Sequence, residues 1–137
     1  MSEQSKLHAV NESKLERWRP YIRQCLDREP RGLRSIVAWD EHGRPRVVQV
    51  ALVVDDKPFP TVFWLIDPAL CLAIDRLEAA GCIARLQQQV DQSAELRAEM
   101  RIDHEKHQAV RAATMTLTER EFLESSGMIG AFTSRGI

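Results

Sequence analysis

The sequence predicts an α+β domain with an N-terminal helical segment, a three-stranded antiparallel meander, and then three to four helices packed on the sheet. β-Branched and aromatic residues concentrate in residues 32–66, where glycine, proline and aspartate divide them into three short runs. From residue 67 onward, apolar residues recur at helical spacing instead. Because the strands come as one run before the helices, the pattern favours α+β over an alternating α/β fold.

Residues 1–31 are predicted to be mainly helical. Asn11 is a suitable N-cap for a helix that carries Leu15 and Trp18 on one side. Pro20 is expected to interrupt this helix or to start a second short one, because a proline lacks the amide hydrogen of a helix interior.

The segment 32–66 is predicted to form the meander. Residues 40–45 contain a glycine and suit a hairpin connection, and residues 55–58 suit a second turn. Apolar residues occupy both faces of the second strand, so we expect it to be central and covered at least partly on both sides. The predicted strands are Leu33–Trp39, Arg46–Val54 and Thr61–Ile66.

Residues 67–124 are predicted to be helical, with start and stop signals typical of successive helices. The predicted boundaries are Asp67–Pro68 and Gly81 for the first helix, Ser93 and Ala113 for a long helix, and a capping box at Thr118–Glu121 for a last short helix.

The last stretch, residues 125–137, is predicted to be a loose tail of the single domain 1–137. It mixes three glycines with apolar side chains. Those side chains need a place to be buried, and a second subunit is one available place. The apolar residues of the tail are Met128, Ile129, Phe132 and Ile137.

Composition excludes several classes of protein. The longest apolar run has six residues, Ala69–Ile74, whereas a membrane helix needs about 20. The first residues lack the apolar stretch of a secretory signal, and three scattered cysteines suit a reducing compartment, so we expect a cytoplasmic protein. With 20 acidic and 19 basic residues, the balanced charge argues against a nucleic-acid partner.

No catalytic motif is present. The sequence lacks a dinucleotide-binding glycine fingerprint, a phosphate-binding loop and a nucleophile elbow. The cysteines do not have zinc-ligand spacing. We therefore expect no cofactor and no metal, and the enzyme question stays open with the balance toward a non-catalytic protein.

The long predicted helix carries the most unusual polar group. At about 100° per residue, Asp103 and His107 interrupt an apolar stripe, with His104 and Arg111 along its edge. Such a group suits a phosphorylated compound, with arginine as a bidentate donor and histidine as a proton carrier. The alternative is a polar break that only fixes helix packing. The candidate site residues are Asp103, His104, His107, Arg111, Arg31 and Arg34.

Two further features qualify as binding elements. Six arginines and two aromatic residues lie within residues 17–34 and suit phosphate or RNA, or else pair with the acidic residues of the middle segment. The segment Pro58–Thr61 is stiffened by two prolines and suits either a ligand-facing loop or a rigid strand connector.

The best functional interpretation is a non-catalytic binding or regulatory module that acts through a protein partner or self-association. The alternative is a small enzyme or ligand-binding domain for a phosphorylated, anionic small molecule, which uses histidine and arginine side chains. The second interpretation requires the candidate residues to converge in one cleft.

The middle of the chain resembles the bacterial domain-of-unknown-function family 501, over roughly residues 28–111. The cysteines that many family members carry in the hairpin and before the third-strand proline are absent, as is the family's C-terminal Cys/His segment. The resemblance therefore implies a shorter or truncated member without any metal site of its relatives. The motifs that carry it are Pro30-Arg31-Gly32, Gly43-x-Pro45, Pro58-Phe59-Pro60-Thr61-x-Phe63-x-Leu65 with Pro68, Arg76-Leu77-Glu78-x-x-Gly81, and His104 with Arg111.

Overall fold

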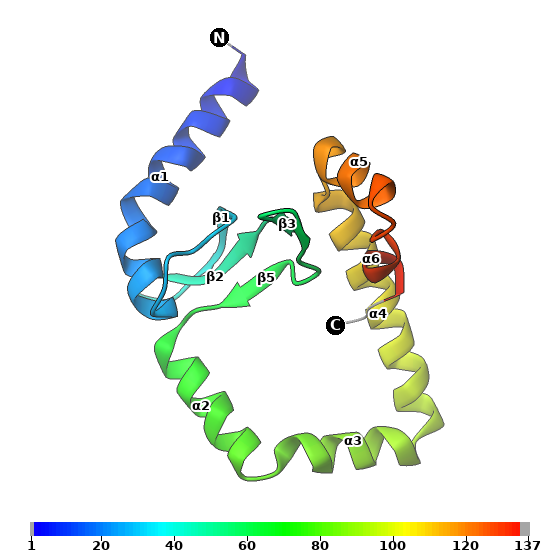
Figure 1. Ribbon diagram of the computed structural model, residues 1–137. Coiled ribbons are helices and arrows are strands. Elements are labelled where there is room, and N and C mark those ends of the chain that lie inside the picture. The colour runs from blue at the N-terminus through cyan, green and yellow to red at the C-terminus, as the bar shows by residue number, and fades with distance from the viewer. Residues whose placement is uncertain (1, 135–137) are drawn as a thin grey trace.

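The chain forms an N-terminal helix, a small antiparallel sheet and then a series of helices, as the sequence predicts (Figure 1). The computed structural model describes residues 2–134. In chain order the elements are α1 (Glu3–Leu26), β1 (Leu33–Trp39), β2 (Pro45–Val50), β3 (Val53–Val54), β4 (Lys57–Pro58), β5 (Phe63–Leu65), α2 (Pro68–Ala79), α3 (Cys82–Gln92), α4 (Ala94–Thr114), α5 (Leu117–Ser125) and α6 (Gly130–Ser134).

Helix α1 is longer and more continuous than predicted. It begins at Glu3, well before the expected cap Asn11, and it continues through Pro20. The predicted start and interruption are therefore wrong. Leu15 and Ile22, one on each side of the proline, are both buried. Their burial offsets the single intrahelical hydrogen bond that proline removes.

The main sheet confirms the predicted antiparallel meander. Strands β1, β2 and β5 are adjacent in that order, and both neighbouring pairs are antiparallel. Ile36 of β1 and Trp64 of β5 both lie opposite Val48 of the central strand. The predicted central position of the second strand is therefore correct.

The second predicted strand, 46–54, is divided in two. Strand β2 ends at Val50, and the Ala51 amide instead donates to the Gly32 carbonyl at 2.7 Å. The chain then forms a separate hairpin from β3 and β4. Its turn residues Asp55–Asp56 have φ values of 50° and 58°, the left-handed pair that a tight two-residue hairpin turn requires.

The turn between β1 and β2 is organised by Asp40. Its carboxylate accepts hydrogen bonds from the amides of His42 and Arg44, both at 2.8 Å, and from Arg44 Nε at 2.7 Å. The Arg44 amide and, after it, the Arg44 side chain and the His42 amide favour the charged form. They lower the pKa of Asp40 from its ordinary value of 3.8 to about 2.

We expect this carboxylate to contribute to acid stability. A group with a depressed pKa stabilises the fold above its unfolded pKa, and that contribution disappears as the pH falls toward 2. Asp40→Asn should therefore be less stable than the wild type at neutral pH and should approach it near pH 2. Thermal melts from pH 7 to pH 2 measure this difference. A gap in melting temperature that is constant over that range would contradict the assignment.

Two hydrophobic clusters stabilise the sheet from different sides. The first joins α1 to β2 and the end of β5, and the second joins the β2–β3 connection to α5 and α6. The buried residues of the first cluster are Ile22, Val48, Val50 and Ile66. Those of the second cluster are Leu52, Val62, Leu123 and Phe132. Val48 and Val50 of the second predicted strand therefore lie in the first cluster, whereas Leu52 lies in the second. The strand is divided in this way because β2 ends at Val50.

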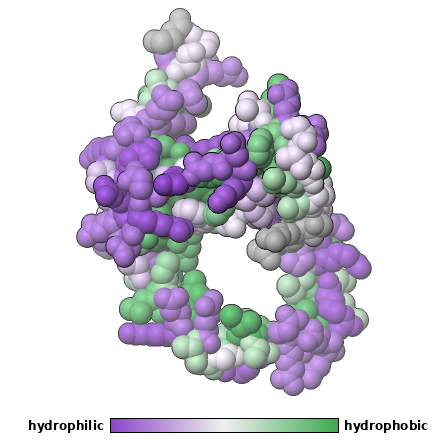
Figure 2. Space-filling model, viewed as in Figure 1, coloured by the Kyte–Doolittle hydropathy of each residue, from purple (hydrophilic) through white to green (hydrophobic). Residues whose placement is uncertain are grey.

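Helices α2 and α3 have no buried residue. Together with α4 they form an arc that leaves the end of the sheet and returns to it at α5 (Figure 1). The space-filling view retains an opening inside this arc (Figure 2). Predicted caps Asp67 and Ser93 are confirmed, and each accepts hydrogen bonds from its helix. Within the described residues, no helix is long and apolar enough to cross a membrane.

The C-terminal segment is more ordered than the loose tail expected from the sequence. Residues Gly130–Ser134 form α6, and Phe132 is buried in the second cluster. Met128 and Ile129 are half-buried against the same cluster. These three apolar side chains therefore find their partners within the chain, while Ile137 lies outside the described residues.

Candidate functional site

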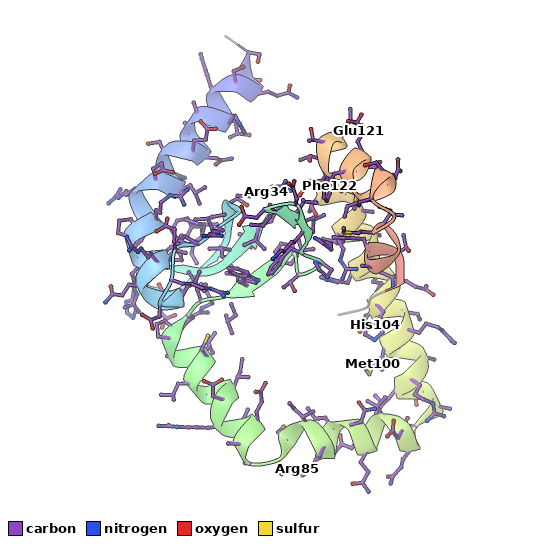
Figure 3. The ribbon with its side chains drawn as sticks, viewed as in Figure 1. Arg34, Arg85, Met100, His104, Glu121 and Phe122 are labelled. Carbon is purple, nitrogen blue, oxygen red and sulfur yellow. The ribbon has the colours of Figure 1, made fainter. Side chains whose placement is uncertain are left out.

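Arg34, one of the predicted site residues, links the sheet to the C-terminal helices. Its Nη2 lies 2.8 Å from Oε1 of Glu119, and its Nη1 donates to the Thr114 carbonyl at 3.3 Å. The buried Glu119 carboxylate also accepts the amides of Leu52 at 2.6 Å and Val53 at 3.1 Å. In Figure 3, Arg34 extends from the sheet into this junction. The charges of Arg34 and Glu119 are therefore committed to a structural contact.

Arg111 is buried, with only 2% of its surface exposed. Its Nη1 donates to the Phe132 carbonyl at 3.2 Å, which connects α4 to α6. Thr114, the residue that receives Arg34, donates its hydroxyl to the Arg111 carbonyl at 2.9 Å. The C-terminal end of α4 is therefore joined to the sheet by Arg34 and to α6 by its own residue Arg111.

The two histidines of α4 lie on its inner side. His104 points into the opening enclosed by the arc, one turn from Met100 (Figure 3). His107 is half-buried, with its ring centroid 6.5 Å from that of Phe63. Burial, then the charge of Arg111, and then the charge of His104 lower the pKa of His107. The neutral form of His107 is therefore favoured near pH 7.

Asp103 does not take part in this arrangement. It is exposed, and among the described residues no hydrogen bond or ion pair joins it to His107. Nor do any three His, Cys, Asp or Glu side chains of residues 2–134 come close enough together to hold a metal ion. That the α4 group binds a phosphorylated compound stays a prediction.

Arg31 lies apart, at the turn between α1 and β1. It forms an exposed ion pair with Asp55, with 2.6 Å between Nη1 and Oδ2. It also lines a cavity of about 410 Å³, whose other lining residues are Arg28, Glu29, Val54, Phe59 and Trp64. This cavity contains none of the other five predicted site residues.

The cavity lies between two segments that are distant in sequence, the arginine-rich segment 17–34 and the Pro58–Thr61 loop. Arg28 lies over the ring of Trp64, with 5.0 Å between Cζ and the ring centroid. Phe59 meets the same ring edge-to-face at 5.4 Å. Arg28 belongs to the predicted arginine-rich segment and Phe59 to the predicted proline-stiffened segment. Their proximity depends on the strand order and the turn that bring the two segments together.

The arc presents a second candidate surface, which sequence reasoning did not identify as exposed. Six large apolar side chains of α2 and α3 have between 39% and 61% of their surface exposed: Leu70, Leu72, Ile74, Leu77, Ile83 and Leu86. Hydrophobic surface is visible along the inner rim over these helices (Figure 2). At about 100° per residue, Leu70, Ile74 and Leu77 share one side of α2, whereas Leu72 lies on roughly the opposite side. Helical periodicity identifies the shared side but does not show what covers it.

Comparison with known proteins identifies a family and no closer relative. No curated protein and no solved structure shows significant similarity to the chain. The sequence profile of a family described as "Protein of unknown function (DUF501)" matches residues 36–137. The match confirms the resemblance from residue 36 and extends it beyond residue 111 to residue 137, whereas the motif Pro30-Arg31-Gly32 lies before the matched residues. The chain therefore belongs to the DUF501 family of proteins of unknown function.

Proposed function

We propose that this protein is a non-catalytic binding module that acts by self-association, with a second copy of the chain covering the apolar side of the α2–α3–α4 arc. The main support is that α2 and α3 contain no buried residue, although each carries large apolar side chains on one side. These exposed side chains are Leu70, Ile74 and Leu77 of α2 and Ile83 and Leu86 of α3. Monomeric soluble proteins rarely expose a contiguous apolar surface of this kind.

The two helices also need external support for their own stability. They have 12 and 11 residues, and isolated helices shorter than about 12–15 residues are marginal in water. In proteins, helical stability comes mainly from packing of the apolar face. Burial against another chain supplies the packing that the sheet does not provide to α2 and α3.

Charge favours a second copy over a strongly charged partner. The segment 68–92 carries three acidic and two basic residues, and the whole chain has a net charge of −1. A mixed rim of this kind suits a self-complementary interface, in which an acid of one copy meets a base of the other. The charged residues of the rim are Asp75, Arg76, Glu78, Arg85 and Asp91.

Matched double variants test this proposal. Ile83→Gln with Leu86→Gln removes two exposed apolar side chains of α3, and Leu7→Gln with Val10→Gln removes an equally spaced and similarly exposed pair of α1. Light scattering of the wild type should give the mass of two chains. The α3 variant should be monomeric with reduced helical circular dichroism, because the apolar face is lost, while the α1 variant should match the wild type.

Two results would contradict self-association. One is a monomeric wild type over the whole concentration series, with slow amide exchange in α2 and α3. The other is an α3 variant that keeps the mass of two chains. Near-ultraviolet circular dichroism of the tryptophans serves as the folding control. A variant that has lost its fold would lose this signal, whereas a folded monomer would keep it.

A cytoplasmic, bacterial setting fits this proposal. The three cysteines, Cys25, Cys71 and Cys82, are all free thiols. Thiols persist in a reducing compartment. Burial raises the pKa of Cys71, and the nearby charges of Asp75 and Asp67 raise it further, so its thiol stays protonated and poorly reactive.

A further inference from the structure

The cavity beside β5 is lined by both apolar and cationic side chains. Its volume of about 410 Å³ lies within the range of small-molecule sites. Val54, Phe59 and Trp64 form the apolar wall, and Arg28 and Arg31 stand at the α1–β1 connection. The cavity is built from segments that the backbone fixes, namely a left-handed hairpin turn and a loop with two prolines.

Two acidic groups near the cavity, Glu29 and Asp55, already pair with arginines. The Glu29 carboxylate lies 3.4 Å from Arg23 and 3.9 Å from Arg19. Asp55 pairs with Arg31 at 2.6 Å, and both of these side chains are exposed, at 64% and 73%. An exposed pair contributes little to stability, so an incoming anion can replace Asp55 on Arg31 at small cost.

Arg28 has donors available for a ligand. In the described part of the chain its side chain makes no hydrogen bond and no ion pair, and its guanidinium rests over the Trp64 ring. A guanidinium held over an aromatic ring keeps its in-plane N–H groups directed outward. Arg28 and Arg31 together present two forked donors, the arrangement that recognises phosphate oxygens.

We propose that this cavity binds a small aromatic phosphate of the nucleoside monophosphate class. Its planar ring packs against the wall of Val54, Phe59 and Trp64, and its phosphate bonds to Arg28 and Arg31. Asp55 occupies Arg31 when no ligand is bound. The proposal concerns a surface outside the α2–α3–α4 arc and does not depend on self-association.

Calorimetric titration of the full chain with AMP and CMP tests the site, with adenosine and inorganic phosphate as half-ligands. A monophosphate should bind more tightly than either half-ligand, because only it uses both parts of the cavity. Arg28→Gln should weaken binding about tenfold, since it removes a charge-assisted donor. Arg17→Gln, an exposed arginine of α1, the helix that precedes Arg28, is the control and should bind within about twofold of the wild type.

A second pair of variants examines the role of Asp55. Asp55→Asn should bind the monophosphate about threefold more tightly, because it releases Arg31. Asp56→Asn makes the same charge change in the same left-handed turn and should have a smaller effect. Asparagine tolerates this backbone conformation, so both variants should fold.

The proposal is overturned by either of two results. One is that neither monophosphate binds more tightly than inorganic phosphate or adenosine. The other is that Arg28→Gln and Arg17→Gln weaken binding equally, which would indicate general attraction to a positive surface. A separation between the two arginine variants, together with tighter binding by Asp55→Asn, supports the site.

Discussion

Glu119→Ala is expected to lower the free energy of unfolding by about 3–5 kcal/mol, the range found when one partner of a buried ion pair is removed. Glu119 has 6% of its surface exposed and receives donors from three parts of the fold. The Leu52 and Val53 amides, the Arg34 guanidinium and the Thr116 amide all point to its two oxygens. Alanine leaves these donors without an acceptor.

The donors around Glu119 outweigh the effect of burial on its pKa. Burial by itself raises the pKa of this carboxyl, but the Thr116 amide, the Arg34 side chain and the Leu52 amide act in the opposite direction and lower it overall. The carboxylate therefore stabilises the fold above its unfolded pKa, and the contribution declines as the pH falls below about 4. Loss of this anchor should separate α5 from the sheet.

Thermal melts measure the effect, and Glu121→Ala is the matched control. Glu121 belongs to the same helix but points away from the sheet (Figure 3). We expect Glu119→Ala to lower the melting temperature by about 10 °C and Glu121→Ala to change it little. Hydrogen exchange at the Leu52 and Val53 amides should accelerate only in the first variant. Equal melting temperatures for the two variants would refute the anchoring role.

The sequence alone does not decide which of two capping boxes begins α5. Both Thr116–Glu119 and Thr118–Glu121 match the capping-box pattern, and the second was predicted. The structure has the first, with Thr116 and Glu119 bonded reciprocally. A shift of two residues along a helix changes which carboxylate faces the sheet, and only packing of Leu123 and Phe122 against the second cluster decides between them.

Local signals predicted the elements well and their long-range partners poorly. The hairpin of Asp40–Pro45, the cap at Asp67 and the cap at Ser93 depend on neighbouring residues, and all three are confirmed. The end of β2 depends instead on Gly32 and Glu119, which take the amides after Val50 away from the sheet. Those contacts span long sequence separations that alternation within one strand does not register.

The candidate residues illustrate the same difference. The spacing of His104, His107 and Arg111 correctly placed them along one side of a helix. It could not show that Arg111 is buried against α6, or that Arg34 is bound to Glu119. Arg28 and Phe59 become neighbours only when the α1–β1 connection and the β3–β4 hairpin meet at β5.

Gly32→Ala should be nearly as damaging as loss of Glu119, with an expected cost of about 2–5 kcal/mol. Gly32 has a φ of +73°, and a Cβ there would lie 2.8 Å from Val54 Cγ2 and 3.1 Å from Ala51 Cβ. Left-handed backbone costs a non-glycine residue about 1–2 kcal/mol, and overpacking costs about 1–3 kcal/mol more. Neither neighbour can move easily, because Val54 is β-branched and the Ala51 amide is bonded to Gly32 itself.

Gly43→Ala separates the two causes. Gly43 has a nearly equal φ of +75°, but a Cβ there would meet no atom within 4 Å. Its alanine variant should therefore lose only the backbone contribution, about 1–2 kcal/mol. Chemical denaturation of both variants gives the difference, which measures the clash with Val54 and Ala51. If the two variants are equally destabilised, the close approach of Gly32 to the β3 segment carries no energetic weight, and the wall of the cavity at Val54 is free to move.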